Sequence, residues 1–343
     1  MSRPTLADVA RLAGVAISTA SVVLNNKGRV SPATRAQVQA AAQALGYQPN
    51  AVARRLASRR TNIVAVVVPS LANPFFATIV HELQGRLLDA GLDIIMYDTE
   101  DDVQLEAKHT ESLLRNRVDG VVFIGQHTGM EHPNDQILRE LPEQGVKLVL
   151  VERELSESPI PQIYADKEEG ARSAVRHLVS LGHRRIAMVG GFLSMGGSFL
   201  RRRGYETALQ EAKIPVDSDL IVDGGFTPLG GYQVTRELLL RRPGITALFV
   251  ANDLMSIGVL KALQESGKRV PEDVSVIGFD NIPESRFLNP SLSTVDVPTR
   301  RLGQAAAEVL LSSLEDKTTN SRTIVFPVEL IIRDSTGPCN VNI

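Results

Sequence analysis

The spacing of hydrophobic residues changes near residue 63 and divides the chain into two parts. Before that point apolar residues recur every three or four positions, which is typical of short amphipathic helices. After it, short continuous apolar runs alternate with helical segments, which is typical of buried parallel strands connected by crossover helices. The pattern predicts an all-α N-terminal head over residues 1–48 and an α/β body.

Two short helices joined at a glycine are predicted at the start of the head. One is expected from about 6 to 13, with Thr5 as its N-cap, and the other from about 17 to 25. Gly14 lies between them, where the chain needs a left-handed or tight turn. This arrangement is a helix-turn-helix.

A third helix completes the predicted head. Ser31 is its expected N-cap, Pro32 its first helical residue, and Gly46 ends it. Three helices can bury one small shared core. The same spacing occurs in any small helical bundle, so periodicity alone does not establish DNA binding.

The first sixty residues are strongly basic. Nine arginine and lysine side chains stand against one acidic side chain, Asp8, which gives a net charge of +8. Because the whole chain has a net charge of −2, the remainder carries −10. Such a division indicates a head that binds nucleic acid and an acidic body with another task.

The body is predicted to contain two parallel-sheet subdomains. Strand-like runs such as NIVAVVVP, DGVVFIG and KLVLVER lie in the first half, and RRIAMVGG, TALFVAND and DVSVIGFD lie in the second. The first subdomain is expected over 62–161 and the second over 162–290. The tail adds a helix at about 298–320 to the first subdomain and a last strand within 321–336 to the second.

Cysteine content and the N-terminus indicate a cytoplasmic protein. The single cysteine, Cys339, excludes an intramolecular disulfide and a cysteine-based metal cluster. The first residues lack the features of a signal peptide, and no apolar run approaches ~18 residues. We expect a protein that is neither exported nor membrane-spanning.

Motifs of catalysis are missing from the sequence. The six histidines do not show the H-E-x-x-H spacing, and no G-x-S-x-G motif is present. The segment GFLSMGGS has the glycine spacing of a phosphate-binding loop, but Gly197 occupies the position of its lysine. We therefore expect no catalytic residue, no metal site and no cofactor.

Specific motifs make the chain resemble a known family of regulators. The segments TLADVARLAGVAISTASVVLN and VSPATRAQVQAAAQALGYQPNAVARRLASRRT are similar to the head of the lactose/galactose repressor family. The body resembles the periplasmic-binding-protein-like core of the same family. The resemblance implies a ligand cleft between the two subdomains.

The resemblance implies that the second helix of the head reads bases in the DNA major groove. Ile17, Ser18 and Val22 would contact base edges. Many members have serine in place of Ala16 and a polar residue in place of Val22, so this helix lacks a bidentate arginine–guanine contact. The hypothesis follows that Ile17 and Val22 contact thymine methyl groups. The other implied DNA contacts in the head are Thr5, Ala16, Thr19, Ser21, Asn25, Arg29, Thr34 and Tyr47.

Residues 49–61 are implied to form a hinge helix and linker. In the family this segment folds on DNA, and Leu56 would wedge into the minor groove. The remaining contacts would come from Asn50, Ala53, Arg54 and Ala57. Alone, so short a helix is marginal in water, and the alternative is a solvated basic linker.

The implied effector site lies beyond the carboxyl ends of the strands, where open parallel sheets bind ligands. Carboxylates and an arginine suit neighbouring sugar hydroxyls, and aromatic faces suit the C–H surface of a sugar. Asp166 and Asn252 are alternatively helix caps, and either Phe75 or Phe76 is alternatively core. The full implied set is Ser70, Asn73, Phe75, Phe76, Asp166, Arg201, Phe226, Asn252, Asp253 and Asp280.

These features together predict a ligand-responsive repressor of carbohydrate-utilisation genes that binds a palindromic operator as a homodimer. A nucleobase-responsive corepressor-type regulator is the alternative within this class. A sugar-binding transport protein and an α/β enzyme with a fused DNA anchor are alternatives of other classes. The chain ends without the leucine heptad of tetrameric members, which favours a dimer.

Overall fold

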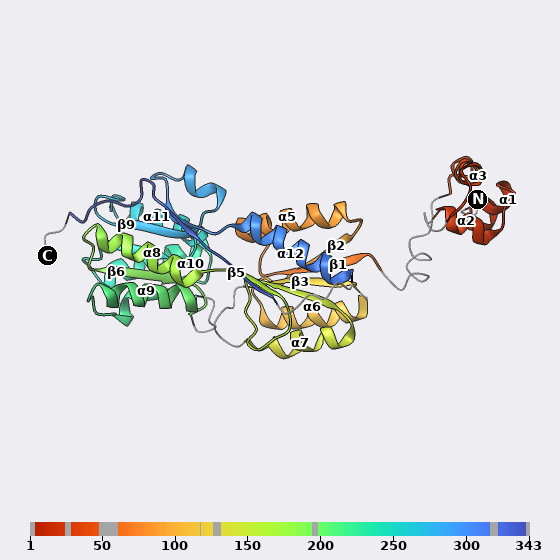
Figure 1. The fold of residues 1–343 in the computed structure, drawn as a ribbon. Helices are drawn as coiled ribbons and strands as arrows, with labels where there is room; N and C mark the ends of the chain where they lie inside the picture. The colour runs from red at the N-terminus through yellow and green to blue at the C-terminus, as the bar shows by residue number, and fades with distance from the viewer. Residues whose placement is uncertain are drawn as a thin grey trace. The chain divides into compact units, whose positions relative to one another are not determined.

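The structure, a computed structural model, describes residues 4–24, 29–47, 61–116, 118–125, 132–193, 198–315 and 322–340. The chain divides into two compact units, residues 1–62 and 63–343, and each is described by itself (Figure 1). Over the described residues no single helix is long and apolar enough to cross a membrane, although the bent pair 6–12 and 17–24 meets a length and composition test jointly.

The head contains the predicted helix-turn-helix and third helix. Its elements are α1 (Leu6–Leu12), α2 (Ile17–Leu24) and α3 (Pro32–Ala44). Thr5 caps α1, because its hydroxyl accepts from the Asp8 amide while the Asp8 carboxylate accepts from the Thr5 amide at 2.9 Å. The predicted N-cap Ser31 accepts from the Thr34 amide at 3.2 Å. The helices bury one small core of Val9, Ala10, Ala20, Val23, Val38, Ala41 and Ala42.

The first subdomain of the body is built on a parallel sheet. Over the described residues it has six strands in the order β11-β5-β4-β3-β1-β2. They are β1 (Ile63–Val68), β2 (Asp93–Asp98), β3 (Gly120–Ile124), β4 (Lys147–Val151), β5 (Gln162–Ala165) and β11 (Thr323–Phe326). Figure 1 shows α5 (Pro74–Asp89) and α12 (Thr299–Leu314) on one face, and α6 (Val103–Asn116) and α7 (Asp135–Glu140) on the other. The short helix η1 (Pro142–Gln144) precedes β4.

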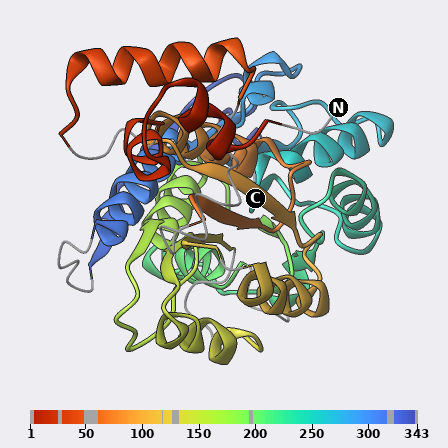
Figure 2. The ribbon, with the colours of Figure 1, turned by 90° about the vertical axis from the view of Figure 1, so that its right-hand side faces the viewer.

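The second subdomain has the same layered plan. Its described strands number six, in the order β12-β10-β9-β8-β6-β7, and only β12 is antiparallel to its neighbour. They are β6 (Ile186–Gly190), β7 (Ile221–Asp223), β8 (Ala247–Val250), β9 (Ser275–Asp280), β10 (Ser293–Asp296) and β12 (Glu329–Ile331). The helix α8 (Lys167–Ser180) packs on α9 (Phe199–Glu211), and α10 (Pro228–Arg241) packs on α11 (Asp253–Glu265) (Figure 2). Short 3-10 turns are η3 (Ser218–Leu220) and η4 (Pro283–Phe287).

Two expected boundaries differ from the structure. The strand β5 pairs with β4 in the first sheet, although residue 162 was expected to open the second subdomain. The tail forms two strands where one was expected, because Pro327 interrupts the run: β11 joins the first sheet and β12 joins the second. Strand partners are chosen by tertiary packing, which local periodicity does not encode.

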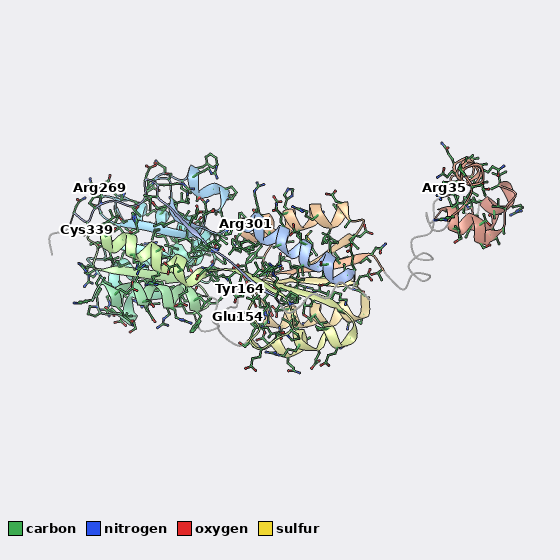
Figure 3. All side chains as sticks on the ribbon, viewed as in Figure 1. Arg35, Glu154, Tyr164, Arg269, Arg301 and Cys339 are labelled. Atoms are coloured by element: carbon green, nitrogen blue, oxygen red, sulfur yellow. The ribbon has the colours of Figure 1, made fainter. Side chains whose placement is uncertain are left out.

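The subdomains are connected three times within the described chain. The connections leave β5 for α8, β10 for α12, and β11 for β12. Figure 3 labels Tyr164 of β5 and Arg301 of α12 in this middle region of the body. The Arg301 guanidinium lies 4.6 Å from the ring of Phe326 in β11, so two of the connections contact one another. Three parallel connections restrict relative motion to rotation or hinge bending of the subdomains.

Candidate functional site

A narrow cleft lies near the strand ends of both sheets. It is bounded by polar and aromatic side chains from both subdomains. The first subdomain contributes Asn73, Phe75, Phe76, Gly125 and Glu152. The second contributes Lys167, Arg201, Phe226, Asn252 and Asp280. The cleft therefore lies at the strand ends where the sequence placed it.

Arg201 and Asp280 form a buried pair in the second subdomain. An Arg201 Nη atom donates to Asp280 Oδ1 at 3.3 Å, and each residue is 5% exposed. The guanidinium lies 4.6 Å from the ring of Phe279 and 5.8 Å from that of Phe226. Burial raises the pKa of Asp280 to about 7, although Arg201 favours the ionised form. The pair offers both a donor and an acceptor to a polar ligand.

Glu152 and Lys167 form a second buried pair, which the sequence did not predict. Lys167 Nζ lies 2.6 Å from Glu152 Oε2, and the other carboxylate oxygen accepts from the Ala165 amide at 2.8 Å. Glu152 is 1% exposed and Lys167 is 3% exposed. Burial lowers the pKa of Lys167, and the neighbouring carboxylate of Glu152 opposes that effect. Their positions could have indicated the site, because Glu152 follows β4 and Lys167 follows the turn after β5.

Helix N-termini face the cleft through two asparagines. Asn73 Oδ1 accepts from the Phe75 amide at 3.0 Å, and Asn252 Oδ1 accepts from the Met255 amide at 2.9 Å. Both asparagines are therefore helix caps and also line the cleft. The Phe75 and Phe76 rings meet edge to face with centroids 5.0 Å apart. Their place in the lining gives the cleft an apolar wall.

Three residues of the expected set do not line the cleft. Asp166 is exposed and caps α8 by accepting from the Glu169 amide at 3.1 Å. Asp253 is fully buried and accepts from the Thr294 hydroxyl at 2.6 Å. Burial raises the pKa of Asp253 well above its usual value, and its contacts hold strand ends together. Ser70 is half-buried and lies outside the lining. The other expected residues do line it, together with the unexpected Gly125, Glu152 and Lys167.

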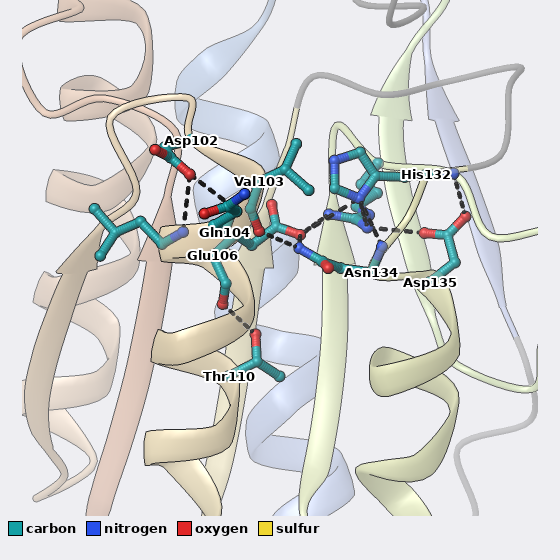
Figure 4. Close-up of polar contacts among 10 residues, drawn as sticks. Asp102, Val103, Gln104, Glu106, Thr110, His132, Asn134 and Asp135 are labelled. Carbon is teal, nitrogen blue, oxygen red and sulfur yellow. Dashed lines mark hydrogen bonds and ion pairs between the residues drawn. The ribbon is translucent and has the colours of Figure 1, made fainter.

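A buried network supports the cleft wall behind Gly125. The Arg153 guanidinium donates to Glu106 Oε1 at 3.0 Å and to Asp135 Oδ1 at 2.8 Å. It also contacts His132 Nδ1 at 2.9 Å, and Figure 4 shows His132 beside Asp135. A Cβ atom at Gly125 would lie 2.9 Å from Arg153 Cβ, so only glycine fits there. The network thereby ties β4 to α6 and α7 next to the cleft.

The head presents the expected reading positions on α2. Ile17 is 55% exposed and Ser18 is exposed, whereas Val22 is half-buried. The structure gives some other expected DNA contacts internal roles as well: Thr5 caps α1, the Thr34 hydroxyl lies 2.8 Å from that of Ser31, and Tyr47 packs against the core. Ala16 and Arg29 are exposed, and Thr19 and Ser21 are half-buried. The expected contacts Asn25, Asn50, Ala53, Arg54, Leu56 and Ala57 lie outside the described residues.

Comparisons with known proteins give the family. The model of bacterial regulatory proteins of the lacI family matches residues 5–50, and that of a periplasmic binding protein-like domain matches residues 175–336. The HTH-type transcriptional regulator DegA of Bacillus subtilis (strain 168) is 33% identical over 98% of this chain and 99% of its own length. The chain belongs to the LacI family. The expected family and fold class are confirmed.

Solved structures of LacI-family proteins extend the similarity over both parts of the chain. The lac repressor dimer bound to operator and the anti-inducer ONPF is 31% identical, with a TM-score of 0.86 over 98% of this chain and all of that chain. The complex of the transcriptional regulator CelR with cellobiose is 36% identical, with a TM-score of 0.73 over 97% of this chain and all of that chain. This LacI-family chain is a DNA-binding transcriptional regulator with a ligand-binding domain.

Proposed function

We propose that this LacI-family regulator represses carbohydrate-utilisation genes and that a sugar in the cleft is its allosteric effector. The observation that supports this most directly is the buried Arg201–Asp280 pair beside Phe226. A guanidinium and a carboxylate hold neighbouring hydroxyls, and an aromatic face packs on the C–H surface of a sugar ring. The similar regulator CelR has been solved with cellobiose bound, which agrees with a sugar effector.

The head is proposed to bind a palindromic operator in the DNA major groove. The exposed positions Ile17 and Ser18 on α2 support this role. The net charge of +8 over the first sixty residues supplies attraction to phosphates. The similar lac repressor was solved as a dimer on its operator, which supports the same mode for this chain.

A homodimer is proposed because the body exposes apolar side chains of its own. Phe287 in η4 is 81% exposed, and on the edge strand β2 Met96 is 48% and Ile95 36% exposed. A second copy of the chain would cover them and place two heads on the two half-sites of a palindrome. The net charge of −10 over the rest of the chain argues against DNA as the partner of this surface.

Effector binding would act on DNA affinity through the relative position of the subdomains. A ligand that contacts both walls of the cleft favours one relative rotation of the subdomains over the other. Because residues 49–61 connect the head to the first subdomain, such a rotation would change the spacing of the two heads of the dimer on the operator. Coupling of this kind is reciprocal, so operator DNA changes the affinity for the sugar by the same factor.

The test is selection of bound DNA from a random pool by the full-length protein at fixed moderate salt. The selection is done without ligand, with each of a panel of neutral and acidic sugars, and with purine bases. The expected result is a palindromic motif whose recovery changes with one sugar. If recovery of the motif changes with a purine base and with no sugar, the effector is a nucleobase and not a sugar. Sequence-independent binding would contradict the regulator itself.

A further inference from the structure

A strained turn after β9, residues 280–282, places Asp280 in the cleft lining. Asp280 is the last residue of β9, and the backbone φ angles of Asp280 and Asn281 are 105° and 54°. Positive φ angles are unfavourable for residues other than glycine, although asparagine tolerates them better than most. Such a conformation persists only where surrounding contacts hold it, and strained residues concentrate at functional sites. The contacts of this turn therefore determine where the Asp280 carboxylate lies.

The Asn281 side chain is held from two sides. Its Oδ1 atom accepts from an Arg333 Nη atom at 2.7 Å, and its Nδ2 atom donates to Asp296 Oδ1 at 2.6 Å. The other Nη atom of Arg333 donates to the carbonyl oxygen of Leu292 at 2.6 Å. Because the guanidinium is planar, two bonds in different directions fix its orientation. Arg333 therefore fixes the position of the Asn281 amide group.

A second contact holds the turn from the protein interior. The Ile282 amide donates to Asp253 Oδ2 at 3.0 Å, and Asp253 Oδ1 accepts from the Thr294 hydroxyl at 2.6 Å. Asp253 and Thr294 are both completely buried. Thr294 lies on β10, as Asp296 does. The turn is thereby attached to β10 through its backbone and through the Asn281 side chain.

The strand β10 leads from this turn to a connection between the subdomains. Asp296 lies opposite Asp280 in the register of β9 and β10, and it is the last residue of β10. Two residues later the helix α12 of the first subdomain begins at Thr299. A rotation of the subdomains must bend this connection. The Asn281–Asp296 hydrogen bond therefore joins the turn in the cleft to a segment that moves with the rotation.

We propose that Arg333 is a positioning residue of the cleft, which acts through Asn281 on the Asp280 carboxylate. By holding the turn it keeps Asp280 beside Arg201, at the 3.3 Å contact between them. Arg333 and Asn281 lie outside the cleft lining. For its effect on effector binding the proposal rests on the proposed function, since the effector must occupy this cleft.

The first test measures the ionisation of Asp280 in the full-length protein without ligand. Burial raises the pKa of Asp280 to about 7. Asn281→Ala removes the contact with Arg333 and leaves Asp280 and Arg201 in place. Release of the turn exposes the carboxylate to water, so its pKa is expected to fall toward 3.8. NMR titration with isotope-labelled aspartate carboxyl groups measures this pKa, and Asp280→Asn identifies the signal.

The second test measures sugar binding by calorimetric titration of the same proteins. The probes are D-glucose, D-galactose, D-xylose and cellobiose. A sugar that binds the wild type is expected to bind Asn281→Ala and Arg333→Gln about tenfold more weakly. The double variant is expected to bind it no more weakly than either single variant, because both substitutions remove the same contact.

A matched control removes a neighbouring hydrogen bond that does not reach the turn. Asp334 follows Arg333 in the chain and accepts from the Ser291 hydroxyl at 2.6 Å. Asp334→Ala is expected to leave the Asp280 pKa and the sugar affinity unchanged. Operator binding and thermal unfolding show which variants are folded, and Asn281→Ala decides the question if Arg333→Gln does not fold.

The outcomes separate this proposal from the proposed function. An Asp280 pKa that is the same in the wild type and in Asn281→Ala overturns the positioning role, and so does an equal change in the control. Unchanged sugar affinity in a variant whose Asp280 pKa has fallen overturns the effect on binding. If the pKa falls as expected and none of the sugars binds the wild type, the positioning role stands and the proposed sugar effector fails.

Discussion

Lys167 Nζ lies 2.6 Å from Glu152 Oε2, although the two residues belong to different subdomains. Replacing Lys167 by methionine would leave the Glu152 carboxylate buried without its countercharge. We expect the free energy of unfolding of the body to fall by about 3 to 5 kcal/mol, measured by urea denaturation. Adding Glu152→Gln should restore most of the loss. The exposed Lys268→Met is the control, and a Lys167→Met effect as small as that of the control would contradict the role of the pair.

The stability of the first subdomain is expected to decrease in acid because of His132. Burial and the neighbouring Arg153 charge lower the pKa of His132 from 6.5 to about 4. Between these values the unfolded chain binds the proton more readily than the folded chain, so stability falls as the pH falls from 6.5 to about 4. We expect His132 to contribute on the order of 2 kcal/mol to this loss after allowance for solvent screening. Urea denaturation of the wild type and of His132→Asn across this pH range measures the loss. If the free energy of unfolding depends on pH in the same way in both proteins, His132 is not the cause.

The contact between α8 and α9 is expected to require glycine at position 204. A Cβ atom there would lie 2.2 Å from the backbone oxygen of Glu168 and 2.8 Å from the amide nitrogen of Arg172. Gly204→Ala should therefore separate the helices and lower the free energy of unfolding by more than about 2 kcal/mol. Gly85, on α5, has open space around it, so Gly85→Ala should raise stability by about 0.5 to 1 kcal/mol. Equal effects of the two substitutions would show that α8 and α9 are not in close contact.

Base reading by α2 is expected to depend on thymine methyl groups. Ile17 is 55% exposed and offers only apolar contact to a base edge. Replacing a contacted thymine by deoxyuridine in the selected operator should cost ~0.8 kcal/mol, or about fourfold in affinity. The loss should disappear in Ile17→Ala, measured at one fixed salt concentration. An operator whose every thymine tolerates the exchange would contradict the methyl contact.

The proposed dimer is expected to depend on Phe287. Burying a phenylalanine side chain contributes about 1.5 to 3 kcal/mol, and a two-fold interface buries it twice. Phe287→Glu should therefore weaken the dimer by at least 100-fold in sedimentation equilibrium. Leu240 on α10 is 82% exposed and serves as the matched control. Dissociation by Leu240→Glu and not by Phe287→Glu would place the interface on α10 instead.

The sequence by itself determined the helices, most of the strands, the family and the edge of the sheets where the cleft lies. These features are local, because the repeat of apolar residues and the residue that follows a strand are both read along the chain. The resemblance to the family, and not the apolar pattern, implied Arg201, Phe226 and Asp280, which line the cleft.

Only the tertiary structure decided which residues meet across the two subdomains. It divided the tail between both sheets, buried Asp253 against Thr294 outside the cleft lining and paired Glu152 with Lys167. Sheet partners and buried ion pairs arise between segments that are distant in sequence, and their energies depend on burial. No periodicity along the chain records that burial, so these features follow from packing alone.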